Sequence, residues 1–477
     1  MRDFKLIYAL SHLNVYELNK FKKFVKSPYF NLNQTFVDYV LILEKYVRNP
    51  KKKLDREKVF VEIFSEEIYS DKKFRKLNTD CLSLFEEFLA VENYSNKKLA
   101  KTNHLLSELR ERRLEKLYNS ILSKSRRYSE QSFSKTSEFY YQQYSLQKNI
   151  FSLTSEFERK AKSKDKLSNF NVPEISYNLD LFYIIEKLRY MCKILSWQSV
   201  RNQKVQINFI DEIVQIVENS ALLRNRVVEI YYQIYMTHVN EEDPKHYFKL
   251  KELIEDYLDV FPLIEAKEIF EAAFTYGIRR VNKGDTKFQS EVLDLYKYAL
   301  TTELLLTDSF LSPTTFRNIT MSSLRLGEFD WTNEFIKSYS NKLNPKFADS
   351  VINYNKALLS FYRKEYQKVI EYLVSFEYDE VNYSLGAKNL LLSTYYELDE
   401  FEALHSLLNS FNVYINRNSR IIDRVKKAYK NLIQFTRKLS KAKYQDKKSI
   451  EKLKKQIEET ELLFSKQWLL SKVNEVL

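Results

Sequence analysis

The chain has 477 residues, of which 44% are hydrophobic and 15% aromatic, so it can bury a core and is not a disordered protein. Only 4 glycines and 7 prolines occur, which excludes folds and phosphate-binding loops that depend on many turns with positive φ. The formal net charge is +13. These numbers predict an all-α protein with an excess of basic surface.

The positive charge is concentrated in two parts of the chain. Residues 1–166 contain 34 Lys/Arg and 22 Asp/Glu, and residues 424–455 contain 13 against 2. Residues 167–423 contain 28 against 36 and are mildly acidic. Clustered positive charge is typical of a nucleic-acid contact. Lysines that merely solvate exposed helices explain the N-terminal excess equally well.

The sequence gives no sign of export or of a membrane span. Cys81 and Cys192 are far apart and belong to no paired motif, so we expect no disulfide framework and place both in the core. The apolar run at the N-terminus is too short for a signal peptide. No stretch of about 18 uncharged apolar residues occurs, so no membrane insertion is expected. We therefore expect a cytoplasmic protein.

Residues 1–95 are predicted to form an N-terminal helical bundle, because apolar residues recur there at helical spacing. The segment Ser27-Pro28-Tyr29-Phe30-Asn31 should interrupt it, since a residue before proline avoids helical φ/ψ values. With this break, the region resembles uncharacterised bacterial helical proteins. That resemblance implies no activity.

Residues 97–175 are predicted to contain charged helices and Ser/Lys-rich junctions. We expect one long helix over 97–127 and a solvated linker over 160–175. Arg110 and Arg113 lie on the outer faces of the first helix and are candidate contacts for an anionic partner. Aromatic residues between these segments are typical of packed helices, and base stacking is the less favoured explanation.

Residues 176–415 are predicted to form antiparallel helix hairpins joined by short connections. Asp243 and Ser312 should each cap a helix, with Pro244 and Pro313 as the first helical residues. The apolar-periodic stretches run near residues 178–198, 205–220, 222–238, 245–260, 263–281 and 287–306.

Three segments within this region share one pattern: an apolar helix, a tight turn and a second apolar helix. They are Leu324-Arg-Leu-Gly-Glu-Phe329, Phe361-Tyr-Arg-Lys-Glu-Tyr366 and Tyr396-Glu-Leu-Asp-Glu-Phe401, whose last aromatic residues are 37 and 35 positions apart. The segments resemble tetratricopeptide repeats, which implies stacked helix hairpins with broad binding surfaces. By that resemblance, the apolar and aromatic residues at both ends of each segment pack the repeats together. Lys364 and Asp399 stand where the first segment has Gly327, so the pattern is divergent.

Residues 416–477 are predicted to form a basic helical hairpin with a C-terminal cap. Apolar residues from Ile422 to Leu439 and from Ile450 to Phe464 form its seam, and Trp468-Leu469-Leu470 folds back on the last repeat. The outer face is cationic and could contact an anionic partner. Its candidate residues are Arg424, Lys427, Lys430, Arg437, Lys438, Lys441, Lys452 and Lys455.

No motif with a catalytic mechanism is present. The glycines are too scattered for a phosphate-binding loop, so no cofactor and no small-molecule substrate are predicted. His238 and His246 are interpreted as surface residues on adjoining helices rather than as metal ligands. A catalytic site assembled from distant helices could not be recognised from the sequence alone.

Two functional hypotheses follow. The first is a non-enzymatic helical-repeat scaffold or adaptor that binds a protein partner. The second is a binder of nucleic acid or ribonucleoprotein that uses the basic ends and is insensitive to base sequence, because no base-reading module accompanies the charges. An anionic membrane surface is a weaker third hypothesis, because the hairpin has little apolar area for insertion.

Overall fold

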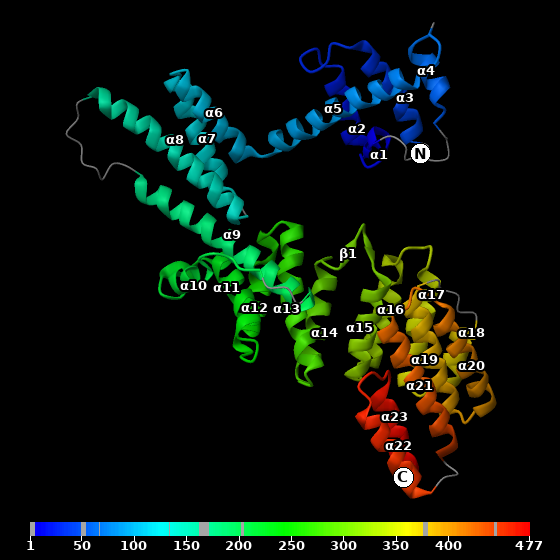
Figure 1. The fold of residues 1–477 in the computed structure, drawn as a ribbon. Coiled ribbons are helices and arrows are strands. Elements are labelled where there is room, and N and C mark those ends of the chain that lie inside the picture. Colours follow the sequence, from blue (N-terminus) through cyan, green and yellow to red (C-terminus); the bar gives the residue numbers. More distant parts are fainter. Residues whose placement is uncertain are drawn as a thin grey trace. The chain divides into compact units, whose positions relative to one another are not determined.

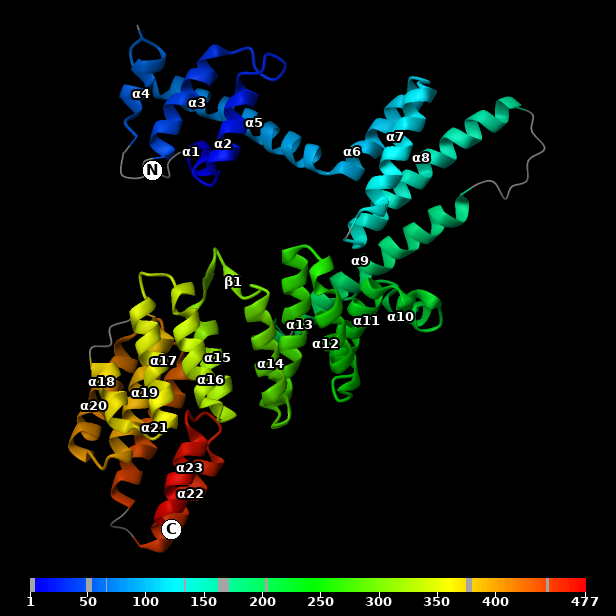
Figure 2. The same cartoon turned by 180° about the vertical axis from the view of Figure 1, so that it is seen from behind.

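The computed structural model describes residues 5–48, 54–65, 67–132, 134–161, 171–201, 205–374, 380–442 and 446–477. Within these ranges the regular structure is helical apart from one short β-hairpin, which confirms the all-α prediction (Figures 1 and 2). The chain divides into two compact units, Met1–Met191 with Gln206–Glu229 and Cys192–Val205 with Ile230–Leu477. None of the described helices is long and apolar enough to cross a bilayer.

The N-terminal bundle of the first unit packs five helices around one aromatic-rich core. A capping box starts its second helix, because the Asn14 side chain accepts from Glu17 N at 2.9 Å and the Glu17 carboxylate accepts from Asn14 N at 2.9 Å. Phe21, Phe85 and Phe88 are all buried in this core. The helices are α1 (Lys5–Leu10), α2 (Val15–Val25), α3 (Gln34–Val47), α4 (Arg56–Ile63) and α5 (Asp71–Asn96).

The predicted break after α2 is confirmed, and it is an ordered loop. The Asn31 amide donates to Val25 O at 2.8 Å, and its Oδ1 accepts from Asn33 N at 2.9 Å. Phe30 stacks on Phe24 with ring centroids 4.1 Å apart. One asparagine side chain thus joins the end of α2 to the start of α3.

The single helix expected over residues 97–127 is two helices in the structure. The helices of this part are α6 (Lys98–Glu111), α7 (Glu115–Glu130), α8 (Ser137–Ala161), α9 (Val172–Arg201) and α10 (Ile210–Glu218). Arg113 has a φ of 56°, and Leu114 N donates to Leu109 O at 2.9 Å, so the chain reverses there without glycine. Of the linker expected over residues 160–175, residues 162–170 lie outside the described residues, and α9 already begins at Val172.

The following helices agree with the predicted stretches, with one exception after residue 301. The elements are α11 (Arg226–Val239), α12 (Lys245–Tyr257), α13 (Leu263–Asn282), α14 (Phe288–Thr301), β1 (Leu306–Thr307) and β2 (Phe310–Leu311), with short 3-10 turns η2 (Ala221–Arg224) and η3 (Leu258–Val260). The helix expected to reach residue 306 gives way to the antiparallel pair of β1 and β2. Asp308 and Ser309 both have positive φ, as a two-residue hairpin turn requires.

The three segments that share one sequence pattern are three helix hairpins. Their second helices begin at Phe329, Tyr366 and Phe401, the aromatic residues that ended each segment. Ser312 caps the first hairpin as predicted, accepting from Thr315 N at 3.0 Å. The cap predicted at Asp243 was wrong, because α12 begins at Lys245 and Pro244 is its N-cap. The helices of this three-hairpin region are α15 (Pro313–Arg325), α16 (Phe329–Tyr339), α17 (Ala348–Tyr362), α18 (Tyr366–Val374), α19 (Val381–Glu397) and α20 (Phe401–Arg417), with η4 (Ser340–Lys342) after α16.

The turns of these hairpins have the same conformation although their sequences differ. Gly327, Lys364 and Asp399 all have positive φ, at 76°, 62° and 57°. In each turn the next residue donates to a carbonyl five positions earlier, at 2.8 to 3.0 Å, which is the Schellman motif. The divergent positions noted in the sequence are therefore structurally equivalent.

The residues expected to pack the hairpins are buried to different degrees. Leu324 and Tyr396 are buried, whereas Phe361 is only half-buried, as are the aromatic residues that begin the second helices. The three positions one turn further on, Thr332, Val369 and Leu404, are fully buried.

The C-terminal helices are α21 (Asp423–Ala442), α22 (Lys447–Glu459) and α23 (Lys466–Val476). Much of the predicted seam is confirmed, because Leu432, Leu439 and Leu453 are buried, but Ile422 is 67% exposed and lies outside it. Helix α21 contacts α20, α22 and α23, so it is part of a larger cluster rather than one arm of an isolated hairpin. The Trp468 indole donates to Glu397 at 3.0 Å and thereby anchors α23 to the end of α19.

Candidate functional site

Six cations of α21 form the surface that we call the basic C-terminal face: Arg424, Lys427, Lys430, Arg437, Lys438 and Lys441. Successive cations are three residues apart except for the seven-residue step from Lys430 to Arg437 and the adjacent pair Arg437 and Lys438, which places all six along one side of the helix. Four of the six are exposed, whereas Arg437 and Lys438 are half-buried. Arg437 donates to Asn409 of α20 at 2.5 Å and Lys438 to Gln456 of α22 at 2.8 Å. Their bonds therefore attach this side of α21 to α20 and α22.

The surroundings of this face do not cancel its charge. Among the described residues, no ion pair involves any of the six cations. The neighbouring helix α20 contributes no carboxylate beyond Glu402, because residues 403–422 contain neither Asp nor Glu. Its exposed positions include Ser406, Ser410 and Asn416. A cationic strip beside a neutral polar helix has the electrostatic character that attracts polyanions.

The two lysines of α22 that were also expected to contact an anionic partner lie among acidic side chains. Lys452 and Lys455 of α22 are exposed, but Lys455 lies 3.8 Å from Glu459, and Glu451 and Glu458 are exposed on the same helix. Helix α22 therefore presents mixed charge. We exclude its two lysines from the basic C-terminal face.

Arg110 and Arg113 lie in the first compact unit, at the turn between α6 and α7. Arg110 is half-buried, and Arg113 occupies the left-handed position of the turn with its side chain exposed. Their placement is explained by the local turn, and the C-terminal cations belong to the other compact unit.

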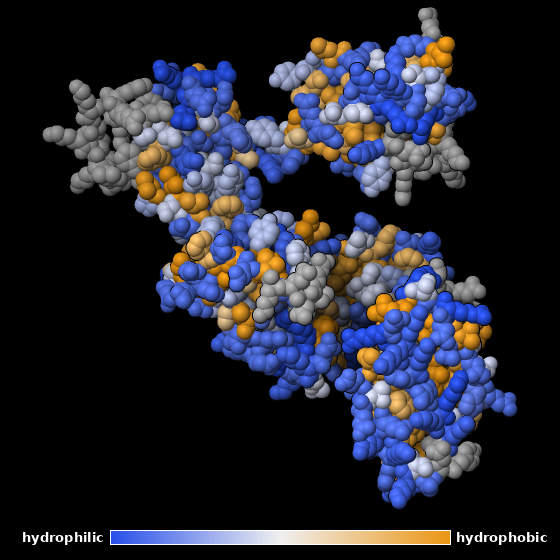
Figure 3. All heavy atoms as spheres, viewed as in Figure 1, coloured by the Kyte–Doolittle hydropathy of each residue, from blue (hydrophilic) through white to orange (hydrophobic). Residues whose placement is uncertain are grey.

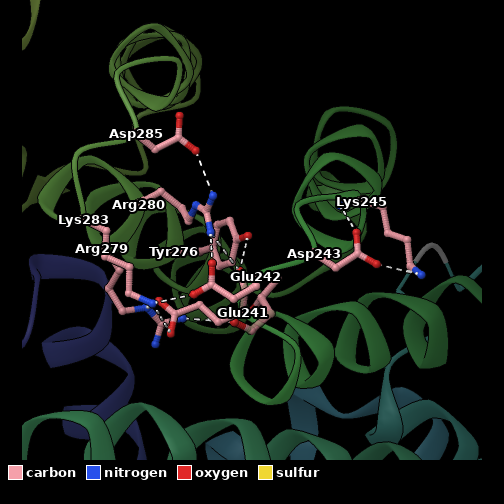
Figure 4. Close-up of polar contacts among 10 residues, drawn as sticks. Glu241, Glu242, Asp243, Lys245, Tyr276, Arg279, Arg280, Lys283 and Asp285 are labelled. Atoms are coloured by element: carbon pink, nitrogen blue, oxygen red, sulfur yellow. Dashed lines mark hydrogen bonds and ion pairs between the residues drawn. The ribbon is translucent and has the colours of Figure 1, made fainter.

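A polar cluster that the sequence analysis missed joins the end of α11 to the end of α13 (Figure 4). Arg280 lies 2.9 Å from both Glu242 and Asp285, and Lys283 lies 2.9 Å from Glu242. Arg279 approaches Glu241 at 3.5 Å. The adjacent acids at 241–242 and the adjacent arginines at 279–280 could have suggested this pairing, since they are separated by about one helix hairpin.

The chemistry of this cluster is that of a structural clamp. Three cations face three carboxylates, so the charges balance within the cluster. Burial and the positive charge of Arg279 lower the pKa of His238 to about 4. A guanidinium can only donate, so the imidazole Nδ1, 3.3 Å from Arg279 Nη1, is the acceptor. A neutral histidine engaged in this way belongs to the packing between the two helix ends.

The interpretation of both histidines as surface residues was wrong for His246, which is buried. His246 is 6% exposed, and its Nδ1 lies 2.7 Å from Gln233 Oε1. His238 is half-buried beside Arg279. Among the described residues, no group of three His, Cys, Asp or Glu side chains is placed to hold a metal ion.

Both cysteines are buried, as expected. Burial raises the pKa of Cys81 to about 12 and also raises the pKa of Cys192. A thiol that stays protonated at neutral pH is a poor nucleophile. These residues therefore contribute packing rather than reactivity.

Comparison with known proteins returned no match to a protein-family model, to a curated protein or to a solved structure. Functional inference for this chain therefore rests on its own residues and on the surfaces described above.

Proposed function

We propose that this chain is a non-enzymatic, tetratricopeptide-like scaffold that binds a protein partner. The observation that carries the proposal is the succession of three hairpins with one turn geometry, whose second helices begin at Phe329, Tyr366 and Phe401. Helix hairpins arranged in series offer broad side-chain surfaces rather than one enclosed pocket. Hydrophilic residues cover most of the face seen in Figure 3, with smaller apolar patches between them. Such mixed surfaces are typical of non-obligate protein interfaces.

The polar groups of the second unit support this proposal. The cluster around Arg280 is neutralised internally, and the half-buried Lys472 is paired with Glu397 at 2.9 Å. Groups whose charges are satisfied inside the fold stabilise it and have no capacity left for acid–base work. Recognition by exposed side chains is then the function that the described surfaces fit best.

The basic C-terminal face favours a second candidate function, which is binding of nucleic acid without sequence preference. Its six cations are spread from Arg424 to Lys441, so they lie on average about 5 Å apart along the helix axis. If six cations meet phosphates, the affinity should fall with salt with a log–log slope of about −4 to −5.

One pair of charge variants separates the two candidates. Lys427→Gln, Lys430→Gln and Lys441→Gln together remove three cations from the basic C-terminal face. Lys337→Gln, Lys346→Gln and Lys368→Gln remove three exposed lysines elsewhere in the same unit and serve as the matched control. Both triple variants change the net charge equally, so a difference in their binding reflects the position of the removed charges rather than the total charge.

The nucleic-acid candidate predicts that the wild type and the control triple bind a mixed-sequence single-stranded oligonucleotide equally. The basic-face triple should bind more weakly, with a salt slope reduced by about 2 to 3. Equal binding by both triples would contradict this candidate.

The protein-scaffold proposal predicts that nuclease-treated wild type and both triples capture the same stoichiometric protein from native lysate at moderate salt. Failure of all three to retain any stoichiometric protein would contradict it.

A further inference from the structure

The last helix of the chain, α23, is joined to α19 of the third hairpin by polar and aromatic contacts. Glu397 at the end of α19 uses both carboxylate oxygens: Oε1 accepts from the Trp468 indole at 3.0 Å, and Oε2 lies 2.9 Å from Lys472 Nζ. The Trp468 ring also meets Tyr396 of α19 edge to face, with centroids 5.5 Å apart. Two side chains of α23 that are four residues apart therefore bind one carboxylate.

Ser465, which precedes α23, supplies a further polar contact and a strained turn. Its hydroxyl and the Asn389 amide of α19 exchange hydrogen bonds at 3.1 and 3.2 Å. Its φ of 52° is left-handed, a conformation that costs free energy for a residue with a side chain, so release of α23 relieves this strain. We call Asn389, Tyr396 and Glu397 the α19 seat.

Helix α23 depends on its contacts with the rest of the chain. It has 11 residues, and an isolated helix of that length is marginal in water. Leu469 and Val473 are its fully buried side chains, and they pack in one cluster with residues of α19, α20, α21 and α22. Gln467, Ser471 and Asn474 of the same helix are exposed. Helix α23 thus has the character of an amphipathic helical ligand that the chain itself supplies.

The α19 seat belongs to a row of helices that the three hairpins share. Helix α17 contacts both α15 and α19, so the first helices of the hairpins lie next to one another. Helix α23 covers part of α19, the last helix of this row. A partner that binds along the row therefore meets α23 at α19.

We propose that α23 is a displaceable latch, and that the α19 seat binds an amphipathic helix of a protein partner once α23 leaves. This inference rests on the proposed scaffold function and assigns its regulation. The partner helix has the chemistry of α23: an aromatic donor followed by an apolar residue, and one turn later a lysine followed by a second apolar residue. Glu397 requires that chemistry, because a poorly exposed carboxylate left without donors is costly.

The test is fluorescence anisotropy of a labelled peptide of residues 461–477, titrated with the full-length chain. An open variant, Leu469→Asp with Val473→Asp, places carboxylates at two fully buried positions and should release the chain's own α23 while the seat stays unaltered. Gln467→Asp with Ser471→Asp changes the charge equally at exposed positions of the same helix and is the matched control. The peptide should bind the open variant at least about tenfold more tightly than the wild type or the control, because both of these keep the seat occupied.

A charge reversal locates the binding at Glu397. A peptide with Lys472→Glu should bind the open variant at least about tenfold more weakly, because a charge-assisted hydrogen bond is lost. Addition of Glu397→Lys to the open variant should reverse the preference, so that the Lys472→Glu peptide binds more tightly than the original one. An unreversed preference would refute the seat, and so would equal binding of the original peptide to the wild type and the open variant.

Hydrogen exchange of the wild type provides a second test that needs no variant, should circular dichroism show that the open variant is unfolded. The amide of Leu469, which donates to Ser465 O at 3.0 Å, should exchange faster than the amides in the middle of α19, because α23 opens alone. Equal exchange would contradict the latch. Light scattering should show a monomeric wild type, and a dimer that the open variant loses would assign the seat to a second copy of the chain and overturn the proposal.

The latch and the scaffold function can fail separately. The peptide experiment needs no natural partner, so its failure contradicts the latch alone. If neither the wild type nor the open variant retains a stoichiometric protein from lysate, that result contradicts the scaffold function alone.

Discussion

Replacement of Gly386 by alanine is expected to destabilise the three-hairpin region, although alanine is the better helix former. A Cβ atom at this position of α19 would overlap the Tyr354 hydroxyl of α17 and would lie 3.0 Å from Tyr354 Cζ. The tyrosine cannot swing away, because it is 4% exposed and its ring centroid lies 4.8 Å from that of Tyr383. Its hydroxyl also takes part in a hydrogen bond with Arg317. Glycine at 386 therefore permits the close approach of α17 and α19.

The magnitude follows from two opposing effects. Overpacking of a rigid, buried ring should reach the upper end of the usual range, about 3 kcal/mol. The higher helix propensity of alanine should return about 1 kcal/mol. The net loss in the free energy of unfolding is then about 2 kcal/mol.

A double-mutant cycle isolates the overlap from other effects. Tyr354→Phe alone should cost about 1 kcal/mol, because its hydrogen bond with Arg317 is lost. Gly386→Ala in the Tyr354→Phe background should cost close to nothing, because the hydroxyl that it overlaps is gone and the gain in helix propensity offsets the remaining close contact with the ring, 3.0 Å from Cζ. Urea unfolding followed by tryptophan fluorescence is the appropriate assay, since Trp197, Trp331 and Trp468 all lie in the second compact unit. If Gly386→Ala costs the same in both backgrounds, the explanation by steric overlap is refuted.

Three further substitutions probe other parts of the fold. Asn14→Ala removes the capping box of α2 and should cost about 1 kcal/mol, measurable by hydrogen exchange in that helix. Gly327→Ala places a Cβ at a φ of 76° and should cost about 1 kcal/mol in the tryptophan-monitored urea assay. The lowered pKa of His238 predicts that stability falls as the pH decreases from 6.5 to about 4, because the unfolded imidazole binds a proton while the folded one stays neutral. His238→Gln should remove this contribution, about 3 kcal/mol at pH 4, and an unchanged pH dependence would contradict the assignment.

Periodicity of apolar residues predicted most helices because each helix buries one stripe against its neighbours. The three-hairpin region is the clearest case. Its second helices begin at the aromatic residues that the repeated pattern singled out, and Thr332, Val369 and Leu404 are fully buried one turn later. The cations of α21 were likewise visible in the sequence, since charge spaced along one helix face needs no tertiary information to be recognised.

The features that the sequence did not reveal depend on contacts between distant residues. The clamp around Arg280 forms only when the end of α13 packs beside the end of α11. The burial of His238 has the same origin. The β-hairpin was missed for a local reason, because Asp308 and Ser309 adopt positive φ in a chain where few residues are glycine.

The turns show why glycine scarcity is a poor guide to the number of helix hairpins in this chain. In the part of the chain that the structure describes, five connections share the Schellman hydrogen-bond pattern with a left-handed residue at its centre: Arg113, Gly284, Gly327, Lys364 and Asp399. A non-glycine residue in that conformation costs about 1 kcal/mol or more, so local preference alone would not select three of these turns. The packing of the paired helices must therefore supply the free energy that holds these three residues in the left-handed conformation. Conversely, weakening the helix contacts should open the turns at Arg113, Lys364 and Asp399 before the turns at Gly284 and Gly327. The amides of Leu114, Glu365 and Glu400 donate the hydrogen bonds of the three non-glycine turns, so their hydrogen exchange can detect that order.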